Sequence, residues 1–382
     1  MKYIDEFRDR ALAQTLTEAI HAEARAGGGR RYRFMEFCGG HTHAIFRFGL
    51  PDLLPPTVQM VHGPGCPVCV LPMARIDAAI QIAQIPDVIL CSYGDMLRVP
   101  GGHRMSLMTA KSHGADVRMV TSPDEAVKIA REFPHKKIVF FAIGFETTAP
   151  TTAVVAKQAL ALNLKNFTIF CNHVLTPPAL KWLLESGRDE TADVLPLDGF
   201  VGPSHVSAVI GTRPYEIAAT HYGKPVVISG FEPLDVLQSI LMLIRQVNAG
   251  VAMVENEYTR AVSREGNVKA QALMQELFTL RDTFEWRGLG FLPQSALRLN
   301  DDFAELDAER RFPLTVEEVK ENRACQCPAI LRGALTPPNC ALFGNACTPD
   351  NPIGSCMVSS EGACAAWYSY GRGREGHENT TA

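Results

Sequence analysis

The stretch Lys137-Ile-Val-Phe-Phe-Ala-Ile143, followed directly by Gly144-Phe-Glu-Thr-Thr148, decides the fold class. A short apolar run that ends in glycine is typical of a buried strand, and we expect a helix to begin soon after it. The same succession recurs from about residue 57 to residue 230. Strands that alternate with helices indicate parallel sheets, so the sequence predicts an α/β protein.

Other apolar runs predict further strands of this kind, at Thr57 to Val61, Asp87 to Cys91, Asp116 to Val120, Asn166 to Cys171 and Pro225 to Ser229. Helices are expected between them. One begins with the capping box Ser122-Pro-Asp-Glu125, and another begins with Thr176-Pro-Pro, an N-cap followed by proline. From Pro233 to about Leu280 we expect long helices.

The pattern predicts two parallel-sheet α/β domains and a smaller C-terminal domain that is rich in cysteine. We place the first over residues 1–130, the second over 131–232, and a helical linker with the third domain over 233–382. Gly144-Phe-Glu146 and Gly230-Phe-Glu232 both follow an apolar strand. This repeated tripeptide is short, so a duplicated domain and a chance match both remain possible explanations.

Composition excludes several classes of function. Of the 382 residues 46% are hydrophobic and 20% are charged, and the net charge is −4. Such a chain offers no basic field for nucleic acid or for anionic lipid. We find no apolar window of about 18 residues, the length that a membrane span needs. The N-terminal stretch is charged rather than apolar, so we expect no secretory signal and a cytoplasmic location.

The chain has eleven cysteines, which the reducing cytoplasm is expected to keep from forming structural disulfides. Cys91 and Cys171 lie inside apolar runs, and we interpret them as core residues. The others lie in segments rich in glycine and proline, where core packing explains them poorly. The largest group consists of Cys325, Cys327, Cys340, Cys347, Cys356 and Cys364.

These C-terminal cysteines predict a metal centre with thiolate ligands, because no histidine lies between Cys325 and Cys364. Structural zinc usually shows paired short knuckles, whereas this spacing is irregular, which favours an iron–sulfur cluster over zinc or free thiols. We expect Cys340, Cys347 and Cys364 to be ligands. Either Cys325 or Cys327 is expected to supply the fourth, with Cys356 the spare.

A second motif, Gly63-Pro-Gly-Cys66-Pro-Val-Cys69, follows the strand predicted at 57–61 and precedes a helix expected over about 72–83. Thiols at such a junction lie near a helix N-terminus, where partial positive charge favours thiolate. The pattern predicts either a reversible disulfide or two ligands for a metal. A loop with incidental cysteines is the plain alternative.

A third motif, Glu36-Phe-Cys38-Gly-Gly-His41-Thr-His43, combines a thiol and two imidazoles in a glycine turn. The glycines permit a tight turn and close approach of a ligand. This grouping indicates either metal binding or a nucleophile with a base.

Glu146, with Thr148, Thr151 and Thr152, stands at the end of a predicted strand. The carboxyl could bind a polar ligand or move a proton, and helix capping by the threonines is the alternative. Asn172-His173 and Pro203-Ser-His205 give weaker signals for the lining of a cleft.

Together these motifs resemble the HypD family of [NiFe]-hydrogenase maturation factors. The resemblance is carried by Cys38-Gly-Gly-His-Thr-His43, Gly63-Pro-Gly-Cys-Pro-Val-Cys69, Gly144-Phe-Glu-Thr-Thr148 and Met357-Val-Ser-Ser-Glu-Gly-Ala-Cys364. It runs from about residue 30 to residue 370.

The resemblance implies assembly of the Fe(CN)2CO group, with carbon monoxide and cyanide bound to a transient iron. A small HypC-like chaperone and a HypE-like donor, which carries cyanide as a thiocyanate, are the implied partners, and the hydrogenase large subunit is served indirectly. By motif, Cys38 is the implied iron ligand with His41 close by. Cys66 and Cys69 become a redox pair and Glu146 an aid to proton movement, while a [4Fe-4S] cluster is implied for the C-terminal region.

Two other hypotheses compete with this reading. One is a thiol–disulfide reductase in which a cluster feeds Cys66 and Cys69. The other is a non-catalytic protein with structural zinc and a surface that binds a partner. Neither needs the motif at Cys38, which is why that motif favours the maturation factor.

Overall fold

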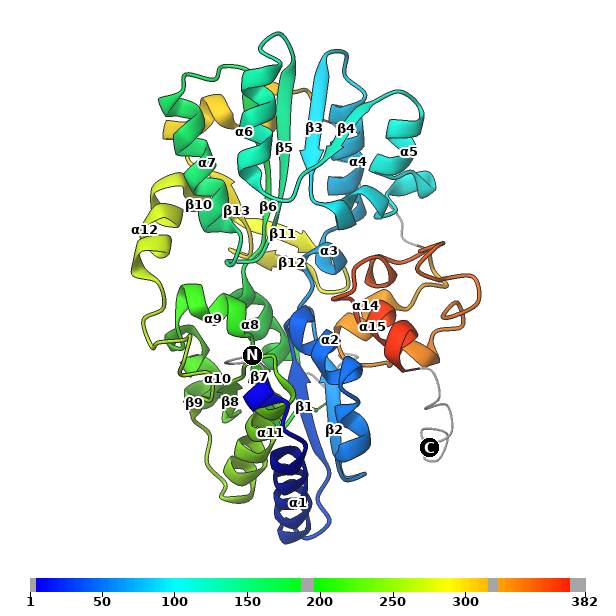
Figure 1. The fold of residues 1–382 in the computed structure, drawn as a ribbon, viewed down its shortest axis with the longest axis vertical. Helices are drawn as coiled ribbons and strands as arrows, with labels where there is room; N and C mark the ends of the chain where they lie inside the picture. The colour runs from blue at the N-terminus through cyan, green and yellow to red at the C-terminus, as the bar shows by residue number, and fades with distance from the viewer. Residues whose placement is uncertain (1–4, 187–195, 315–321, 372–382) are drawn as a thin grey trace.

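The computed structural model describes residues 5–186, 196–314 and 322–371 and has an α/β fold with two parallel sheets (Figure 1). Sheet A has the order β2-β1-β7-β8-β9, and every neighbouring pair is parallel. Its strands are β1 (Tyr32–Glu36), β2 (Val58–His62), β7 (Gly199–Gly202), β8 (Val226–Ile228) and β9 (Val254–Asn256).

Sheet B is built from one continuous part of the chain. It has the order β4-β3-β5-β6 and is also parallel throughout. In Figure 1 the carboxyl ends of both sheets face the middle of the molecule. The strands are β3 (Val88–Ser92), β4 (Asp116–Met119), β5 (Lys137–Gly144) and β6 (Phe167–His173).

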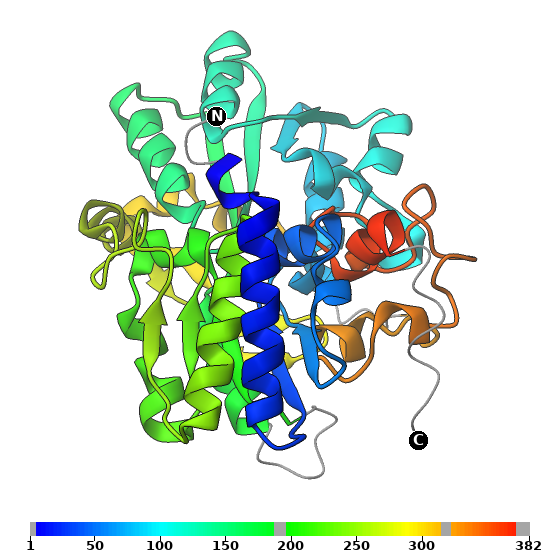
Figure 2. The same cartoon turned by 60° about the horizontal axis from the view of Figure 1, so that its bottom comes forward.

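Helices cover both faces of each sheet. On sheet A, α1 (Arg10–Ala26), α2 (Gly39–Arg47) and α11 (Pro233–Asn248) share one core, and α1 lies along α11 (Figure 2). The other face of sheet A carries α8 (Thr176–Ser186), α9 (Ser204–Ile210) and α10 (Glu216–Tyr222).

On sheet B, α4 (Met73–Ala83) and α5 (Leu107–Ser112) pack on one face. The opposite face carries α6 (Pro123–Glu132) and α7 (Ala149–Ala161).

The strand β5 explains why a continuous apolar run makes a buried strand. Successive side chains point to opposite faces, so Phe140 joins the core under α6 and α7 while Phe141 joins the core under α4. Both rings are fully buried, and each such burial contributes about 1.5–3 kcal/mol. A strand that alternated apolar and polar residues could not be covered on both faces in this way.

The C-terminal third is made of short elements. After α12 (Val268–Leu277), two antiparallel pairs form, β10 (Phe278–Leu280) with β13 (Leu297–Leu299) and β11 (Thr283–Trp286) with β12 (Gly290–Pro293). The helices α13 (Ala308–Arg311), α14 (Cys327–Leu331) and α15 (Ala363–Tyr370) follow. Residues 322–371, here called the cysteine-rich segment, lie beside α2 and near the end of sheet B.

Short helices complete the fold. The α-helical turn α3 (Pro67–Val70) precedes α4. The 3-10 helices are η1 (Asp5–Phe7), η2 (Leu50–Leu53), η3 (Gly94–Arg98), η4 (Gly102–Arg104), η5 (Arg213–Tyr215), η6 (Asp301–Leu306), η7 (Pro337–Asn339) and η8 (Ser355–Met357).

The predicted α/β class is confirmed, and the predicted strands appear within about one or two residues of their expected positions. Residues 233–280 are a correction, because β9 interrupts the expected helices and completes sheet A. The strands of sheet B lie on both sides of residue 130, and those of sheet A lie in all three predicted ranges. The ranges 1–130 and 131–232 therefore do not each match one sheet.

The two Gly-Phe-Glu loops occupy equivalent places in different sheets. Gly144 ends β5 of sheet B, and Gly230 follows β8 of sheet A.

Within the described ranges, no helix has the length and apolar character needed to cross a membrane.

Candidate functional site

Cys38 lies at the carboxyl end of β1, where it is the N-cap residue of α2. Its side chain is buried, with 8% exposed. The carboxylate of Glu36 holds this turn in place, because its Oε2 accepts the N–H of Cys38 at 3.1 Å. Its Oε1 accepts the hydroxyl of Thr42 at 2.5 Å and contacts Nδ1 of His62 at 2.6 Å. A fully buried carboxyl thereby finds several partners and fixes the loop.

The surroundings of Cys38 favour the neutral thiol. Burial raises the pKa of Cys38 well above its usual range, and the charges of Glu361 and Glu36 raise it further. A thiolate at this position therefore needs a positive partner close by, such as a metal cation.

His41 is fully buried in α2 and directs Nε2 at two backbone carbonyls. Ser229 O lies at 3.1 Å and Gly230 O at 3.0 Å, so Nε2 carries the proton and donates it. Burial lowers the pKa of His41, which keeps the ring neutral at pH 7. Nδ1 is then an unprotonated, buried nitrogen, and it has no hydrogen-bond partner within the described part of the chain.

The loop that follows β8 packs against this ring. Phe231 lies 4.8 Å from the ring of His41 and 4.3 Å from that of His205, between centroids. Ser204 donates its hydroxyl to Ser229 O. The weak signal at Pro203-Ser-His205 therefore marks residues beside the Cys38 loop. His43 instead faces Tyr370 of α15, with 5.3 Å between ring centroids.

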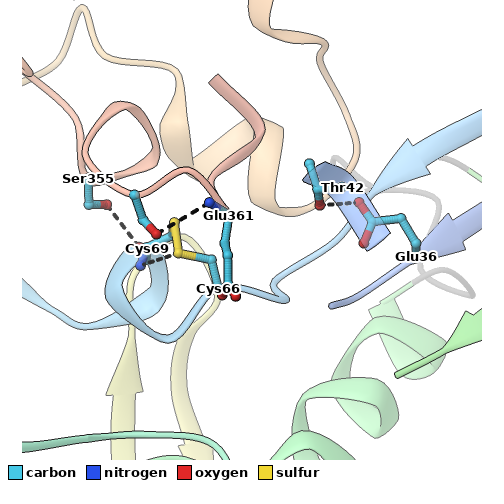
Figure 3. Close-up of a disulfide and its surroundings, with 7 residues drawn as sticks. Glu36, Thr42, Cys66, Cys69, Ser355 and Glu361 are labelled. Carbon is cyan, nitrogen blue, oxygen red and sulfur yellow. Dashed lines mark hydrogen bonds between the residues drawn. A yellow bond between two sulfur atoms is a disulfide. The ribbon is translucent and has the colours of Figure 1, made fainter. Parts of the chain in front are cut away.

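Cys66 and Cys69 form a disulfide at the start of α3, with their Cα atoms 5.2 Å apart (Figure 3). Both are buried, at 3% and 0% exposure. The loop before the pair touches the Cys38 turn, because the N–H of Gly39 donates to Gly65 O at 3.0 Å. A Cβ on Gly65 would stand 2.3 Å from the nitrogen of Cys38, so only glycine permits this approach.

The opposite side of the disulfide touches the cysteine-rich segment. The hydroxyl of Ser355 donates to Cys69 O at 3.0 Å, and α3 packs against η8 (Figure 3). Ser355 directly precedes Cys356. The disulfide therefore lies between the Cys38 turn and the C-terminal cysteines.

Glu361 was not singled out from the sequence, although it lies inside a quoted motif. A Cβ on Gly39 would stand 2.3 Å from the Cβ of Glu361 and 2.9 Å from its Oε2, so Gly39 makes room for this side chain. Burial raises the pKa of Glu361, and the charges of Asp95 and Glu36 add to the effect. The motif that contains Glu361 did not predict that its side chain lies against Gly39, because this contact joins residues that are distant in sequence.

The C-terminal cysteines converge on one place, here called the cysteine pocket. Hydrogen bonds with Cys327 and Cys364 lower the pKa of Cys356, which places all three thiols together. Cys356, expected as the spare, is therefore at the pocket as well. The thiols that line the pocket itself belong to Cys325, Cys327, Cys340, Cys347 and Cys364.

The donor set of the cysteine pocket fits an iron–sulfur cluster. Backbone also approaches the sulfurs, since the N–H of Ile353 donates to Sγ of Cys347 at 3.3 Å. A Cβ on Gly354 would stand 2.4 Å from Sγ of Cys327 and 2.7 Å from Sγ of Cys325. In the described ranges no group of three His, Cys, Asp or Glu side chains has the tight arrangement that holds a single ion.

Glu146 lies elsewhere, at the carboxyl end of β5. Its Oε1 accepts the N–H of Thr176 at 2.9 Å and its Oε2 accepts the Thr176 hydroxyl at 3.0 Å. The carboxyl thus joins the start of α8 to sheet B. Burial raises its pKa to about 7, so it exchanges a proton near neutral pH.

The remaining polar residues near Glu146 have local partners. Thr148 donates to Ile143 O and Phe145 O, and Thr151 donates to Thr148 O. His173 contacts Thr152 at 2.9 Å. Asn172 accepts from the buried Arg75. The threonine hydroxyls therefore donate to nearby carbonyls, and Thr148, the N-cap residue of α7, makes no side-chain cap hydrogen bond.

Comparisons with known proteins agree with the motifs. The family model described as HypD, "Hydrogenase formation hypA family", matches residues 11–371. The "Hydrogenase maturation factor HypD" of Azotobacter vinelandii is 61% identical over 375 residues, covering 98% of each chain. That of Cupriavidus necator is 60% identical over 372 residues, covering 97% of this chain and 98% of the relative. That of Escherichia coli is 47% identical over 375 residues, covering 97% and 98%. The chain therefore belongs to the HypD family of hydrogenase maturation factors.

Proposed function

We propose that this chain, with a small HypC-like chaperone, holds the iron on which the Fe(CN)2CO group of a [NiFe] hydrogenase is assembled. The observation that carries the proposal is the position of the Cys66–Cys69 disulfide. It touches the Cys38 turn through Gly65 on one side and the cysteine-rich segment through Ser355, which precedes Cys356, on the other. Electrons would thus have a short path toward the iron.

In this proposal the transient iron is the substrate, and Cys38 provides its thiolate ligand. Soft thiolate suits iron that carries cyanide and carbon monoxide. Nδ1 of His41 is the nearby nitrogen that is free of a proton, because Nε2 is committed to Ser229 O and Gly230 O. Glu146, at the carboxyl end of β5 and with its pKa near 7, would serve proton movement.

The chemistry of cyanide release balances through the dithiol form of Cys66 and Cys69. One thiol attacks the thiocyanate sulfur of a HypE-like donor, forms a mixed disulfide and releases cyanide to the iron. The second thiol then resolves the mixed disulfide. The donor leaves as a free thiol, the pair becomes a disulfide, and one proton accompanies each cyanide.

Returning the disulfide to the dithiol takes two electrons and two protons. A [4Fe-4S] cluster, when bound, supplies electrons one at a time. We assign its ligands to Cys340, Cys347, Cys364 and one of Cys325 and Cys327. Cys356 stays the spare in this assignment, although its contacts with Cys327 and Cys364 keep it within reach.

The proposal is tested on protein purified without oxygen together with its HypC-like partner. We expect a brown protein with about four irons per chain, and infrared bands of bound cyanide and carbon monoxide. Cys38→Ala should remove these bands, whereas Cys91→Ala, a matched change in a core cysteine, should keep them. Bands that persist in Cys38→Ala would remove Cys38 from the iron site.

The competing hypotheses make different predictions. A protein-disulfide reductase would reduce a protein disulfide without any iron bound together with the partner, whereas our proposal requires that iron. A structural zinc protein would be colourless, and it would tolerate Cys66→Ser together with Cys69→Ser. In our proposal that double variant keeps the C-terminal iron and loses the cyanide bands.

A further inference from the structure

We propose that a groove beside the cysteine pocket is the docking site of a small, acidic, one-electron carrier protein of the ferredoxin class. This inference rests on the proposed function, because a disulfide that is repeatedly reduced needs a steady supply of electrons. No group assigned above supplies them to the pocket. The structure offers one surface that meets the requirements of such an entry point.

The groove lies between two walls that are distant in sequence. One wall is the loop from η3 to α5, and the other is the stretch 349–353 of the cysteine-rich segment, with Asn322 beside it. Figures 1 and 2 both show the cysteine-rich segment next to this part of sheet B. The lining residues used here are Met73, Arg98, Arg104, Met108, Asp350 and Ile353.

Two residues that line the groove contact cysteines of the pocket directly. Ile353, which lines it, donates its N–H to Sγ of Cys347 at 3.3 Å. Asn322, also in the lining, accepts the N–H of Cys325 at 2.9 Å. Cys325 is the one cysteine of the pocket that is partly exposed in the described part of the chain. A carrier seated in the groove would therefore be separated from the thiols by a very thin layer of protein.

The chemistry of the lining matches a transient redox partner. Met73, Met108 and Ile353 provide an apolar floor, and Met108 is 48% exposed. Thioether side chains adapt to different partners, which suits brief encounters. Electron-transfer complexes are at the small end of protein interfaces, so a groove of this kind is sufficient.

Charge selects the class of carrier. Arg98 and Arg104 stand at the rim and are exposed, while Asp350 is the only carboxylate among the lining residues that the structure describes. Two guanidiniums against one carboxylate make this rim positive in a chain whose net charge is −4. A positive rim steers an acidic partner and raises its association rate.

Both arginines also have structural contacts. Arg98 donates to Pro349 O and Val358 O, and Arg104 donates to Asn351 Oδ1 at 3.3 Å. These bonds hold the guanidiniums at the rim, but they would equally serve to clamp the two walls. The test must therefore separate charge from clamping, and Arg104 is the suitable position because Arg98 is tied more closely to the segment.

The experiment uses the full chain, purified without oxygen, and an acidic two-iron ferredoxin as the probe. Binding is measured by calorimetry at several salt concentrations, and reduction of the chain by reduced ferredoxin is followed by stopped-flow absorbance. We expect an affinity that falls as salt rises, since exposed charges are screened. Arg104→Glu and Met108→Asp should each slow reduction by at least about fivefold, mainly through association.

Two further variants serve as controls. Arg104→Lys keeps the charge and loses the planar fork, so it should keep most of the rate if charge is what matters. Arg131→Glu makes the same charge change on α6, which covers the opposite face of sheet B, and it should leave the rate unchanged. A loss in Arg104→Lys equal to that in Arg104→Glu would reveal a clamp and overturn the proposal. Equal losses in Arg131→Glu and Arg104→Glu, or absence of salt-dependent binding, would also overturn it.

Reduction by dithionite separates this inference from the proposed function. Suppose that dithionite reduces Cys66 and Cys69 in every variant, while the rate of reduction by ferredoxin does not change in the variants of the rim. The docking site is then wrong and the proposed function stands. If the purified chain holds no iron, or dithionite never reaches the disulfide, the proposed function itself fails, and the docking site with it.

Discussion

The carboxyl of Glu146 has no charged partner among its hydrogen-bonding groups, and burial raises its pKa to about 7 from a usual value of 4.5. Between these two values the folded chain binds more protons than the unfolded chain. The free energy of unfolding should therefore fall as pH rises from about 5 to 8, by about 3 kcal/mol at most.

Glu146→Gln removes this titration, so the variant should gain stability relative to the parent as pH rises through that window. Urea unfolding of both proteins at pH 5.5 and 8 measures the difference. Other titrating groups are common to both proteins and cancel. A difference that does not change with pH would show that Glu146 is already charged in the folded state.

His41 makes a second prediction at the residue scale. Because Nε2 donates to Ser229 O and Gly230 O, we expect the neutral Nε2–H tautomer, and the lowered pKa should preserve it at pH 7. Nitrogen-15 spectra of the iron-free chain with labelled histidine report the tautomer directly. His113, a surface histidine, provides an internal reference. A protonated Nδ1 in the His41 signal would contradict the assignment.

Among the elements, the small β11–β12 hairpin connects two helices that carry cysteines, α3 and α14. Its turn reaches the disulfide helix, since the N–H of Arg287 donates to Val70 O at 2.7 Å. It also reaches α14, because a Cβ on Gly288 would stand 2.9 Å from Cα of Pro328. The turn thus joins the residues that follow Cys69 and Cys327.

Two glycines of this turn make a matched pair. Gly288 and Gly290 both have positive φ, at 84° and 81°, so alanine strains either by about 1–2 kcal/mol. Gly290 has open space around it, whereas Gly288 faces Pro328. Gly288→Ala should therefore lower the free energy of unfolding more than Gly290→Ala, as denaturant titration would measure. An equal decrease in the free energy of unfolding in both variants would mean that Gly288 has no close steric contact with α14.

For the molecule as a whole, the cysteine-rich segment ties distant parts together. The α15 helix packs on α2, where the rings of Trp367 and Phe46 lie 4.8 Å apart. Ser355 bonds to the disulfide helix, and Arg98 donates to Val358 O. Because metal binding orders loop-rich segments, removing iron should loosen these contacts as well.

Hydrogen exchange measured with and without iron tests this coupling. We expect faster exchange without iron in the cysteine-rich segment and also in α2 and α3. The helices α1 and α11, which pack on each other away from the segment, should stay unchanged. Faster exchange confined to residues 322–371 would show that the segment is an independent unit.

A structural feature could be predicted from the sequence when neighbouring residues determine it, and it was missed when contacts between distant residues determine it. The strand at 137–144 and the start of a helix after Ser122 follow from patterns of neighbouring residues, and both were predicted. The capping box expected there was wrong, because Ser122 makes no side-chain cap hydrogen bond and Glu125 accepts from Thr121 instead. The strands β1, β7 and β9 were missed, because charged, polar or glycine residues interrupt their short apolar runs and pairing partners determine them. Glu361 was missed for the same reason, since its contact with Gly39 joins residues far apart in the chain.

The sequence by itself determined the α/β class, the two cysteine groups and the Cys38 turn, because strand burial and backbone turns depend on adjacent side chains. Only the tertiary structure decided that the Cys66–Cys69 pair touches Gly39 on one side and Ser355 on the other. It also decided that strands from three regions of the chain share sheet A. The physical reason is that strand order and close packing are chosen by contacts between distant residues, which no local pattern specifies.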